Sequence, residues 1–279
     1  MSAIRTVLSA AALLLLAGQA SAADLRIAIV QAQAGEARKY QPLLEYLRTK
    51  GVGASFVTTA DYRAAADLFA KGGVDAMFGG SGIAGTFIIK DLAYPVVHGV
   101  GTDGVGTYSA VVVAPKGSPR FTGAGGYFDG KRVIYSALAS AGEFYFESLG
   151  KSAPAAKLKA ASHGAALDAL SRGQADVAIV KNHVWAKEQG KYPGLERVGG
   201  DDGENPDGTL VVAKHVAQPQ VAAVSAALLG LEADGSPAAK AARDALKLRG
   251  YEAITVKGFA HTLDLLKRAR VGKDFTFAY

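Results

Sequence analysis

The sequence predicts an α/β fold of two lobes joined by two hinge segments. Short runs of β-branched residues alternate with amphipathic windows of helical period, which is typical of domains with mostly parallel sheets. The alternation occurs in two blocks, at residues 24–100 and 131–198, and the chain passes between them at residues 109–116 and 205–214. Two crossings between two blocks predict a hinge around a cleft.

Eight short segments are predicted as strands, since each is rich in β-branched residues and bounded by turn residues. They are residues 25–30, 54–58, 76–78, 109–114, 132–135, 158–161, 177–180 and 209–213. Amphipathic windows lie between them. Gly73, Gly150 and Gly173 follow three of these windows and mark helix ends.

The segment after residue 214 contains three mainly helical windows and too few strands for a third domain. We expect it to pack back on the first lobe. The predicted domains are therefore a signal segment at residues 1–22, a first lobe of residues 23–112 and 209–279, and a second lobe of residues 113–208.

Residues 1–22 are predicted to be a cleavable export signal. Arg5 gives it a positive start, residues 8–17 form an apolar stretch too short to span a bilayer, and residues 20–22 form an Ala-Ser-Ala cleavage site. We therefore expect a mature periplasmic chain that starts near Ala23. An uncleaved signal anchor is the alternative.

The composition argues against several classes of function. The chain has no cysteine, so we expect no lipid anchor, disulfide, thiol catalysis or cysteine-based metal site. The formal net charge of +6 comes from Lys and Arg that are interleaved with Asp and Glu, except for a basic cluster at residues 267–273. We predict no nucleic-acid partner, while the mild positive balance suits capture of a small anion.

Familiar cofactor and catalytic patterns fail on their context. Gly99, Gly101 and Gly104 match G-x-G-x-x-G, but the run leads into a predicted strand and opens no helix, which argues against a dinucleotide site. The five His residues are widely spaced, and no G-x-S-x-G turn is present. We therefore predict no cofactor, no metal site and no catalytic residue, and hence a protein that is not an enzyme.

Several stretches of the sequence carry a family resemblance. They are RIAIVQAQ, PLLEYL, FVTTADYRAAADLFAKGGVDAMFGGS, VVVAPKGSP, SHGAALDALSRGQADVAIV and NPDGTLVVAK. In these stretches the chain resembles the periplasmic phosphonate-, phosphite- and phosphate-binding proteins of ABC importers, in the PhnD, SsuA and transferrin-like family. The resemblance implies a type II periplasmic binding protein, which closes two lobes on one small ligand and passes it to a membrane permease. Such receptors are usually monomers.

The expected ligand site lies outside the carboxyl ends of the strands, where loops and helix starts converge. Four loops meet this condition, at residues 31–35, 61–62, 79–82 and 136–142. The residues predicted to bind the ligand come from these loops and from two further positions of the second lobe. They are Gln31, Tyr62, Gly80, Ser81, Ser136, Ser140, Ala141, Gly142, His163 and Lys181.

Ser140 is predicted to begin a helix as its N-cap, and the small residues Ala141 and Gly142 leave the first backbone amides accessible to an oxyanion. The resemblance implies a turn rich in Ser and Thr here, which grips phosphoryl or phosphonyl oxygens. Ala139 and Ala141 stand where further hydroxyls are expected. The alternative is an ordinary capping box with Glu143, since the residues fit S-x-x-E. Both roles stay open.

For three other side chains, ligand contact competes with a structural role. The resemblance implies contact at Tyr62 and His163, which are otherwise a rim aromatic and a satisfied structural His. Lys181 follows a predicted strand at the mouth of the cleft, where a cation suggests a fully anionic ligand. Its alternative is a salt bridge to Glu204 or Asp207.

These observations predict a periplasmic receptor that captures a small oxyanion, such as phosphate, phosphite or a phosphonate, for an ABC importer. Two other functions stay open. A sensing subunit would present its ligand, for example an arsenic or selenium oxyanion, to a membrane sensor kinase. An enzyme on the same fold would need a base in the cleft, for which only His163 is a candidate.

Overall fold

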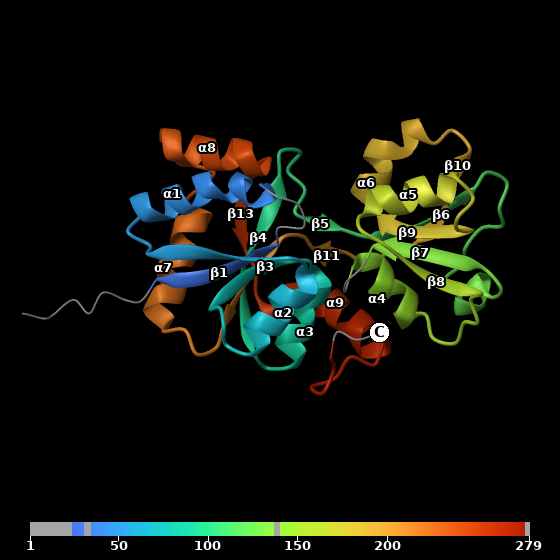
Figure 1. The fold of residues 1–279 in the computed structure, drawn as a ribbon, viewed down its shortest axis with the longest axis horizontal. Coiled ribbons are helices and arrows are strands. Elements are labelled where there is room, and N and C mark those ends of the chain that lie inside the picture. Colours follow the sequence, from blue (N-terminus) through green and yellow to red (C-terminus); the bar gives the residue numbers. More distant parts are fainter. Residues whose placement is uncertain (1–23, 31–34, 137–139, 277–279) are drawn as a thin grey trace, which may run out of the picture.

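The computed structural model describes residues 24–30, 35–136 and 140–276 and shows two lobes side by side (Figure 1). Each lobe is built on a mixed β-sheet flanked by helices, which confirms the predicted α/β fold. The predicted signal segment and Gln31 lie outside the described residues. Within those residues, no helix has the length and apolar character needed to cross a membrane.

The sheet of the first lobe has the strand order β13-β4-β12-β3-β1-β2. β1 pairs in parallel with β2 and β3, because a helix returns the chain to the same edge after each strand. β12 comes back from the second lobe and pairs antiparallel with β3 and β4. The strands are β1 Leu25–Val30, β2 Ala54–Thr59, β3 Ala76–Gly79, β4 Ala93–Gly101, β12 Thr209–Ala213 and β13 Leu248–Ala253. The helices around them are η1 Glu36–Tyr40, α1 Gln41–Thr49, α2 Tyr62–Ala70, α3 Ser81–Ile89, α7 Gln218–Leu229 and α8 Pro237–Leu246.

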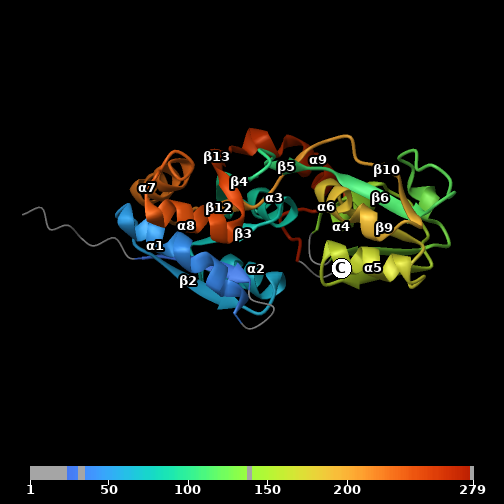
Figure 2. The same ribbon diagram turned by 90° about the horizontal axis from the view of Figure 1, so that it is seen from above.

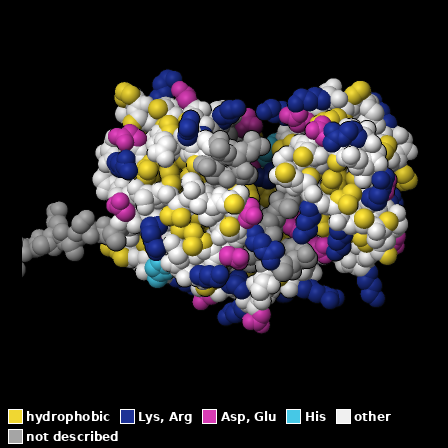
Figure 3. All heavy atoms as spheres, viewed as in Figure 1, with side chains coloured by type: hydrophobic (Ala, Val, Ile, Leu, Met, Phe, Trp, Pro, Cys, Tyr) yellow, Lys and Arg dark blue, Asp and Glu magenta, His cyan; other side chains and the backbone are white. Residues whose placement is uncertain are grey.

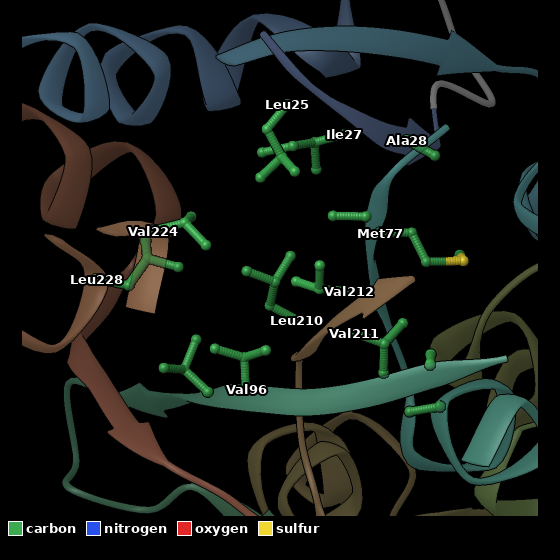
Figure 4. Packing of buried hydrophobic residues seen from close by; sticks show 14 of the residues in the cluster. Leu25, Ile27, Ala28, Met77, Val96, Leu210, Val211, Val212, Val224 and Leu228 are labelled. Atoms are coloured by element: carbon green, nitrogen blue, oxygen red, sulfur yellow. The ribbon is translucent and has the colours of Figure 1, made fainter. Parts of the chain in front are cut away.

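The core of the first lobe is centred on the middle strands of this sheet. Ile27 of β1, Met77 of β3 and Leu210 of β12 are all fully buried, and Val224 and Leu228 of α7 belong to the same core (Figure 4). A strand in the middle of a covered sheet is buried on both faces. For this reason the whole run TLVVA of β12 is apolar apart from its first residue.

The sheet of the second lobe has the strand order β10-β6-β9-β7-β8, with helices on both faces (Figures 1 and 2). β7 pairs in parallel with β8 and β9, while β6 pairs antiparallel with β9 and β10. The strands are β6 Ala110–Pro115, β7 Arg132–Ser136, β8 Ala156–Ala160, β9 Val177–Lys181 and β10 Leu195–Gly200. The helices are η2 Gly125–Phe128, α4 Ala141–Ser148, α5 His163–Ser171, α6 Asn182–Glu188 and η3 Gln189–Lys191.

The eight predicted strands correspond to β1, β2, β3, β6, β7, β8, β9 and β12, with ends that differ by at most two residues. β4, β10 and β13 were not predicted. β4 contains Pro95, which argues against a strand in sequence, yet Pro95 lies at a register shift between β12 and β4 where a ladder bond is dispensable. β10 and β13 contain Gly and charged residues, and β13 adds an edge strand to a segment predicted as mainly helical.

Two short strands connect the lobes. β5 (Thr107–Tyr108) and β11 (Asn205–Pro206) form a two-stranded antiparallel ribbon between the two sheets (Figure 1). The first crossing therefore lies before residues 109–116, because Ala110–Pro115 already form β6 in the second lobe. The domain boundary placed after residue 112 falls inside β6, and the boundary before residue 209 falls at the start of β12.

Helix α9 (Ala260–Arg268), which follows η4 (Val256–Phe259), joins the two lobes a third time. Leu265 packs in a core of the second lobe, whereas its neighbour Leu266 packs in the core of the first lobe. The Thr262 hydroxyl donates a hydrogen bond of 2.7 Å to the side-chain oxygen of Asn205 in the hinge. The trailing segment was expected to pack on the first lobe, where α7 and α8 lie (Figure 2), and α9 packs on both lobes.

Truncating Leu266 tests the contribution of α9 to stability. Leu266 is fully buried, so Leu266→Ala leaves a cavity and should lower the free energy of unfolding by about 2–5 kcal/mol. Leu229→Ala is the matched control, because the Leu229 side chain is 39% exposed and should lose no more than about 0.5 kcal/mol. Chemical denaturation measures both changes, and equal losses would contradict a buried anchor at Leu266.

Candidate functional site

A cavity of about 240 Å³ opens where the carboxyl ends of strands from both lobes face each other. In the first lobe its lining comes from the segments that follow β2 and β3. In the second lobe it comes from the carboxyl ends of β7, β8 and β9 and the segments that follow them. Its lining residues are Tyr62, Gly80, Ile83, Tyr108, Ser136, Ser140, Ala141, Ala161, Ser162, His163 and Lys181. Figure 3 shows that the surface is indented between the lobes and that Lys and Arg are spread over both, with Asp and Glu among them.

The cavity brings together residues that are far apart in the sequence and that the loop positions predict. Tyr62, Gly80, Ser136, Ser140, Ala141, His163 and Lys181 all line it. Larger hollows of about 840, 670, 560 and 440 Å³ lie around Trp185, His261, Ala227 and Lys247, respectively. We place the candidate site in the cavity of about 240 Å³ because several helices begin there, and helix N-termini favour anions.

In the described part of the chain, four helices of eight or nine residues start at this cavity, α2, α3, α4 and α5, and the seven-residue α6 starts there after Lys181. Three of them have side-chain caps, in which Asp61, Ser140 and Ser162 accept a hydrogen bond from the amide three residues later. The remaining amides of each first turn have no acceptor inside the helix, and the helix dipole adds partial positive charge. The arrangement therefore favours a small anion over a neutral or cationic ligand.

Ser140 combines the two roles that the sequence left open. Its hydroxyl oxygen accepts a hydrogen bond of 3.2 Å from the Glu143 amide, as in a capping box, and Ser140 also lines the cavity. A hydroxyl that accepts in this way still has its own hydrogen to donate. The carboxylate of Glu143 is fully buried and forms an ion pair of 3.2 Å with Lys159.

Ser81 and Gly142 belong to the predicted set but do not line the cavity. Ser81 is buried, and its hydroxyl is hydrogen-bonded to the hydroxyl of Tyr108, so it fixes the position of a lining residue. A Cβ atom at Gly142 would clash with the carbonyl oxygen of Ile179. Gly142 is therefore required for close packing of α4 against β9.

Lys181 lines the cavity and is paired with Asp207, the alternative that the sequence left open. Its Nζ lies 2.6 Å from Oδ1 of Asp207 and 4.2 Å from the centre of the Tyr108 ring. Burial tends to raise the pKa of Asp207, but the charge and hydrogen bond of Lys181 outweigh it and hold that pKa below its usual value. The carboxylate is thus ionised and Lys181 has a full counter-charge.

His163, the first residue of α5, is uncharged at neutral pH. Burial lowers its pKa to about 3, and the nearby charge of Lys181 acts in the same direction. Its Nδ1 is buried and has no hydrogen-bond partner among the described residues. The uncharged imidazole of His163 can therefore form a hydrogen bond with a ligand. It is a poor general base because its conjugate acid is strong.

Sequence reasoning missed Tyr108, Ile83, Ala161 and the lining role of Ser162. Tyr108 lies in the hinge strand β5, shortly after the glycine-rich run at Gly99, Gly101 and Gly104, whose context argues against a dinucleotide site. It is almost fully buried, and burial is the main reason that its pKa is raised, so its hydroxyl stays protonated. A Tyr between a glycine-rich turn and a buried strand at a predicted crossing is the signal that could have indicated it.

The comparison with known families decides the assignment. A family described as "ABC transporter, phosphonate, periplasmic substrate-binding protein" matches residues 10–259. The chain belongs to this family. Its members are binding proteins of ABC transporters, so the protein is not an enzyme. No curated protein matches the sequence.

Solved structures of this fold agree with that family. A protein of Xanthomonas citri bound to ATP aligns with a TM-score of 0.73 at 16% identity, over 90% of this chain and 98% of that one. PhnD1 of Prochlorococcus marinus, in complex with methylphosphonate, gives a TM-score of 0.68 at 14% identity, over 88% and 98%. A binding protein component of an ABC phosphonate transporter from Pseudomonas aeruginosa gives 0.66 at 15%, over 89% and 87%. At these identities the likeness shows the fold.

A bulky residue at Gly80 should fill the cavity without unfolding the lobe. A Cβ atom at Gly80 meets nothing within 4 Å, and its φ of −66° suits any residue. Gly80→Leu should cost about 1 kcal/mol of stability as a poorer helix cap and abolish binding of any anion to the cavity. Gly190→Leu, at a second unobstructed glycine outside the cavity, is the control. Calorimetry with the anion that binds the wild type measures this, and unchanged binding by Gly80→Leu would place the site elsewhere.

Proposed function

We propose that this chain is a periplasmic receptor that captures one small oxyanion, of the phosphate, phosphite or phosphonate kind, for an ABC importer. The observation that carries the proposal is the convergence of four helix starts from both lobes on one small cavity among the described residues. Such a cavity supplies amide and hydroxyl donors on several sides, and this suits a tetrahedral anion with three or more oxygens. Membership of the phosphonate-binding family supports the same class of ligand.

The donors on the two lobes complement one another. Ser136 and Ser140 line the cavity from the second lobe, Tyr62 lines it from the first, and Tyr108 comes from the hinge. A similarly folded protein has been solved with methylphosphonate, whose one methyl group and three oxygens fit a cavity that combines hydroxyls with Ile83 and Ala161. The ligand is held by hydrogen bonds and charge, with no covalent step.

Export and delivery complete the proposed function. The signal segment directs the chain to the periplasm, where cleavage leaves a mature protein that starts near Ala23. The liganded receptor then docks as a monomer on the permease of an ABC importer. The lobes proposed to close are the predicted domains, with the first boundary moved from residue 112 back to the hinge strand β5, because β6 lies wholly in the second sheet.

Ligand binding should make the molecule more compact. The two lobes are connected by the β5–β11 ribbon and by α9, so a ligand held by both lobes favours rotation of one lobe toward the other. Small-angle scattering at saturating methylphosphonate should give a smaller radius of gyration than without ligand. The Gly80→Leu variant serves as the control that cannot bind. An unchanged wild-type radius at demonstrated saturation would contradict closure.

Removing Lys181 should weaken anion binding more than removing either of two other lining side chains. Lys181→Ala deletes a charged donor and leaves the Asp207 carboxylate unpaired, so it should cost about 1.5–3 kcal/mol of binding, roughly ten- to a hundredfold in affinity. Ser140→Ala should cost about 0.5–1.5 kcal/mol because the helix amides remain, and His163→Ala a similar amount.

Calorimetric titration with methylphosphonate, phosphite and phosphate measures these affinities. Lys191→Ala is the matched control, since Lys191 pairs with Glu188 on the surface of the second lobe, away from the cavity. Unchanged affinity in all three site variants, with folding intact, would refute the proposed site. Failure of the wild type to bind any of the three anions would refute the proposed ligand class.

A further inference from the structure

The one permanent charge in the described cavity lining is cancelled by its ion-pair partner. Lys181 is the one lining residue of the described set with a permanent charge, and its Nζ lies 2.6 Å from the carboxylate of Asp207. His163 also lines the cavity and is uncharged at neutral pH. Residues 31–34 and 137–139, outside the described set, read QAQA and ALA and contain no ionisable side chain.

An ion pair attracts an anionic ligand less strongly than an unpaired lysine does. An anion that reaches Lys181 also comes within range of the ionised Asp207, so attraction and repulsion largely offset each other. The helix starts contribute partial positive charges, which suit the first negative charge of a ligand. A second full negative charge finds no counter-ion among the described lining residues, and desolvation of an uncompensated charge is strongly unfavourable.

We propose that the cavity selects the singly charged, protonated form of its oxyanion over the doubly charged form. This inference rests on the proposed function and specifies the charge of the ligand. A protonated oxygen of the ligand also needs a hydrogen-bond acceptor, which the N–H groups of the helix starts cannot provide. The neutral imidazole of His163 is an acceptor in the cavity lining, and a lysine or arginine in its place would not be.

The ionisable groups near the cavity keep one charge state near neutral pH. Burial lowers the pKa of His163 to about 3 and also lowers the pKa of His183, so both are neutral above about pH 6.5. The pKa of Asp207 is held low despite its burial, and burial raises that of Tyr108. The other charged groups beside these residues are Asp61 at the start of α2, Asp103, Asp201 with its partner His261, Glu204 on Thr107, and the Glu143–Lys159 pair. The four groups with shifted pKa values therefore do not cause a pH dependence of binding in this range.

Calorimetric titration of the wild type with methylphosphonate tests the inference when it is run on both sides of the second pKa of the ligand and above about pH 6.5, where His163 and His183 are neutral. Apparent affinity should fall toward tenfold per pH unit above the second pKa of the ligand. Titrations in two buffers of different ionisation enthalpy should then show uptake of one proton per bound ligand. Affinity that stays constant or rises with pH, without proton uptake, would overturn the inference and leave the proposed receptor function intact. If methylphosphonate, phosphite and phosphate all fail to bind at any pH, the receptor function itself fails.

Asp207→Asn separates the ion pair from other causes. The amide keeps the shape of the side chain and can still accept from the Gly208 amide, but it leaves Lys181 with an uncompensated charge. The variant should bind the doubly charged ligand about tenfold more tightly than the wild type and lose most of the pH dependence. Asp176→Asn breaks a comparable pair with Arg132 elsewhere in the second lobe and should keep the wild-type profile. A wild-type profile in folded Asp207→Asn would overturn the role of the pair, and the wild-type titration decides the selectivity even if this variant does not fold.

Discussion

A parallel β-α-β crossover returns the chain to the same edge of its sheet each time, and the candidate site depends on this constraint. Every helix that follows a parallel strand begins at the carboxyl edge, so its free amides point to one side of the lobe. In this protein the carboxyl edges of the two sheets face each other across the hinge. Four helix starts from segments separated by about a hundred residues in the sequence therefore surround one small cavity among the described residues.

The polar side chains at the hinge form a continuous chain of contacts between the lobes. Ser81, at the start of α3, is hydrogen-bonded to Tyr108 in β5. The ring of Tyr108 lies under Lys181 of β9, which is paired with Asp207 between β11 and β12. A ligand that displaces or shares any of these contacts acts directly on both hinge strands. The candidate site and the hinge are thus joined by one connected set of polar contacts.

Periodicity and turn chemistry predict most of this fold and much of the candidate site, and the failures arise from contacts between segments that are far apart in the sequence. Ser140 and His163 are predictable because caps and loops at strand ends are short-range features. The partner of Lys181 depends on how two segments meet in space, and sequence could only name Asp207 as one alternative. β4 escapes prediction because Pro95 is tolerated only at a register shift that the neighbouring strand creates. α9 joins the lobes through Leu265 and Leu266, which read as one ordinary apolar stripe.

The position of β12 has a consequence for the order in which the molecule can assemble. β12 lies between β3 and β4, in the middle of the first sheet, but it is made only after the whole second lobe. All strands of the second sheet lie between residues 110 and 200, so that lobe can complete its sheet from one contiguous stretch. When the chain is made from its N-terminus, the position between β3 and β4 therefore stays unfilled until residues 209–213 are made. The lobe that begins the polypeptide is the last to become a closed structure.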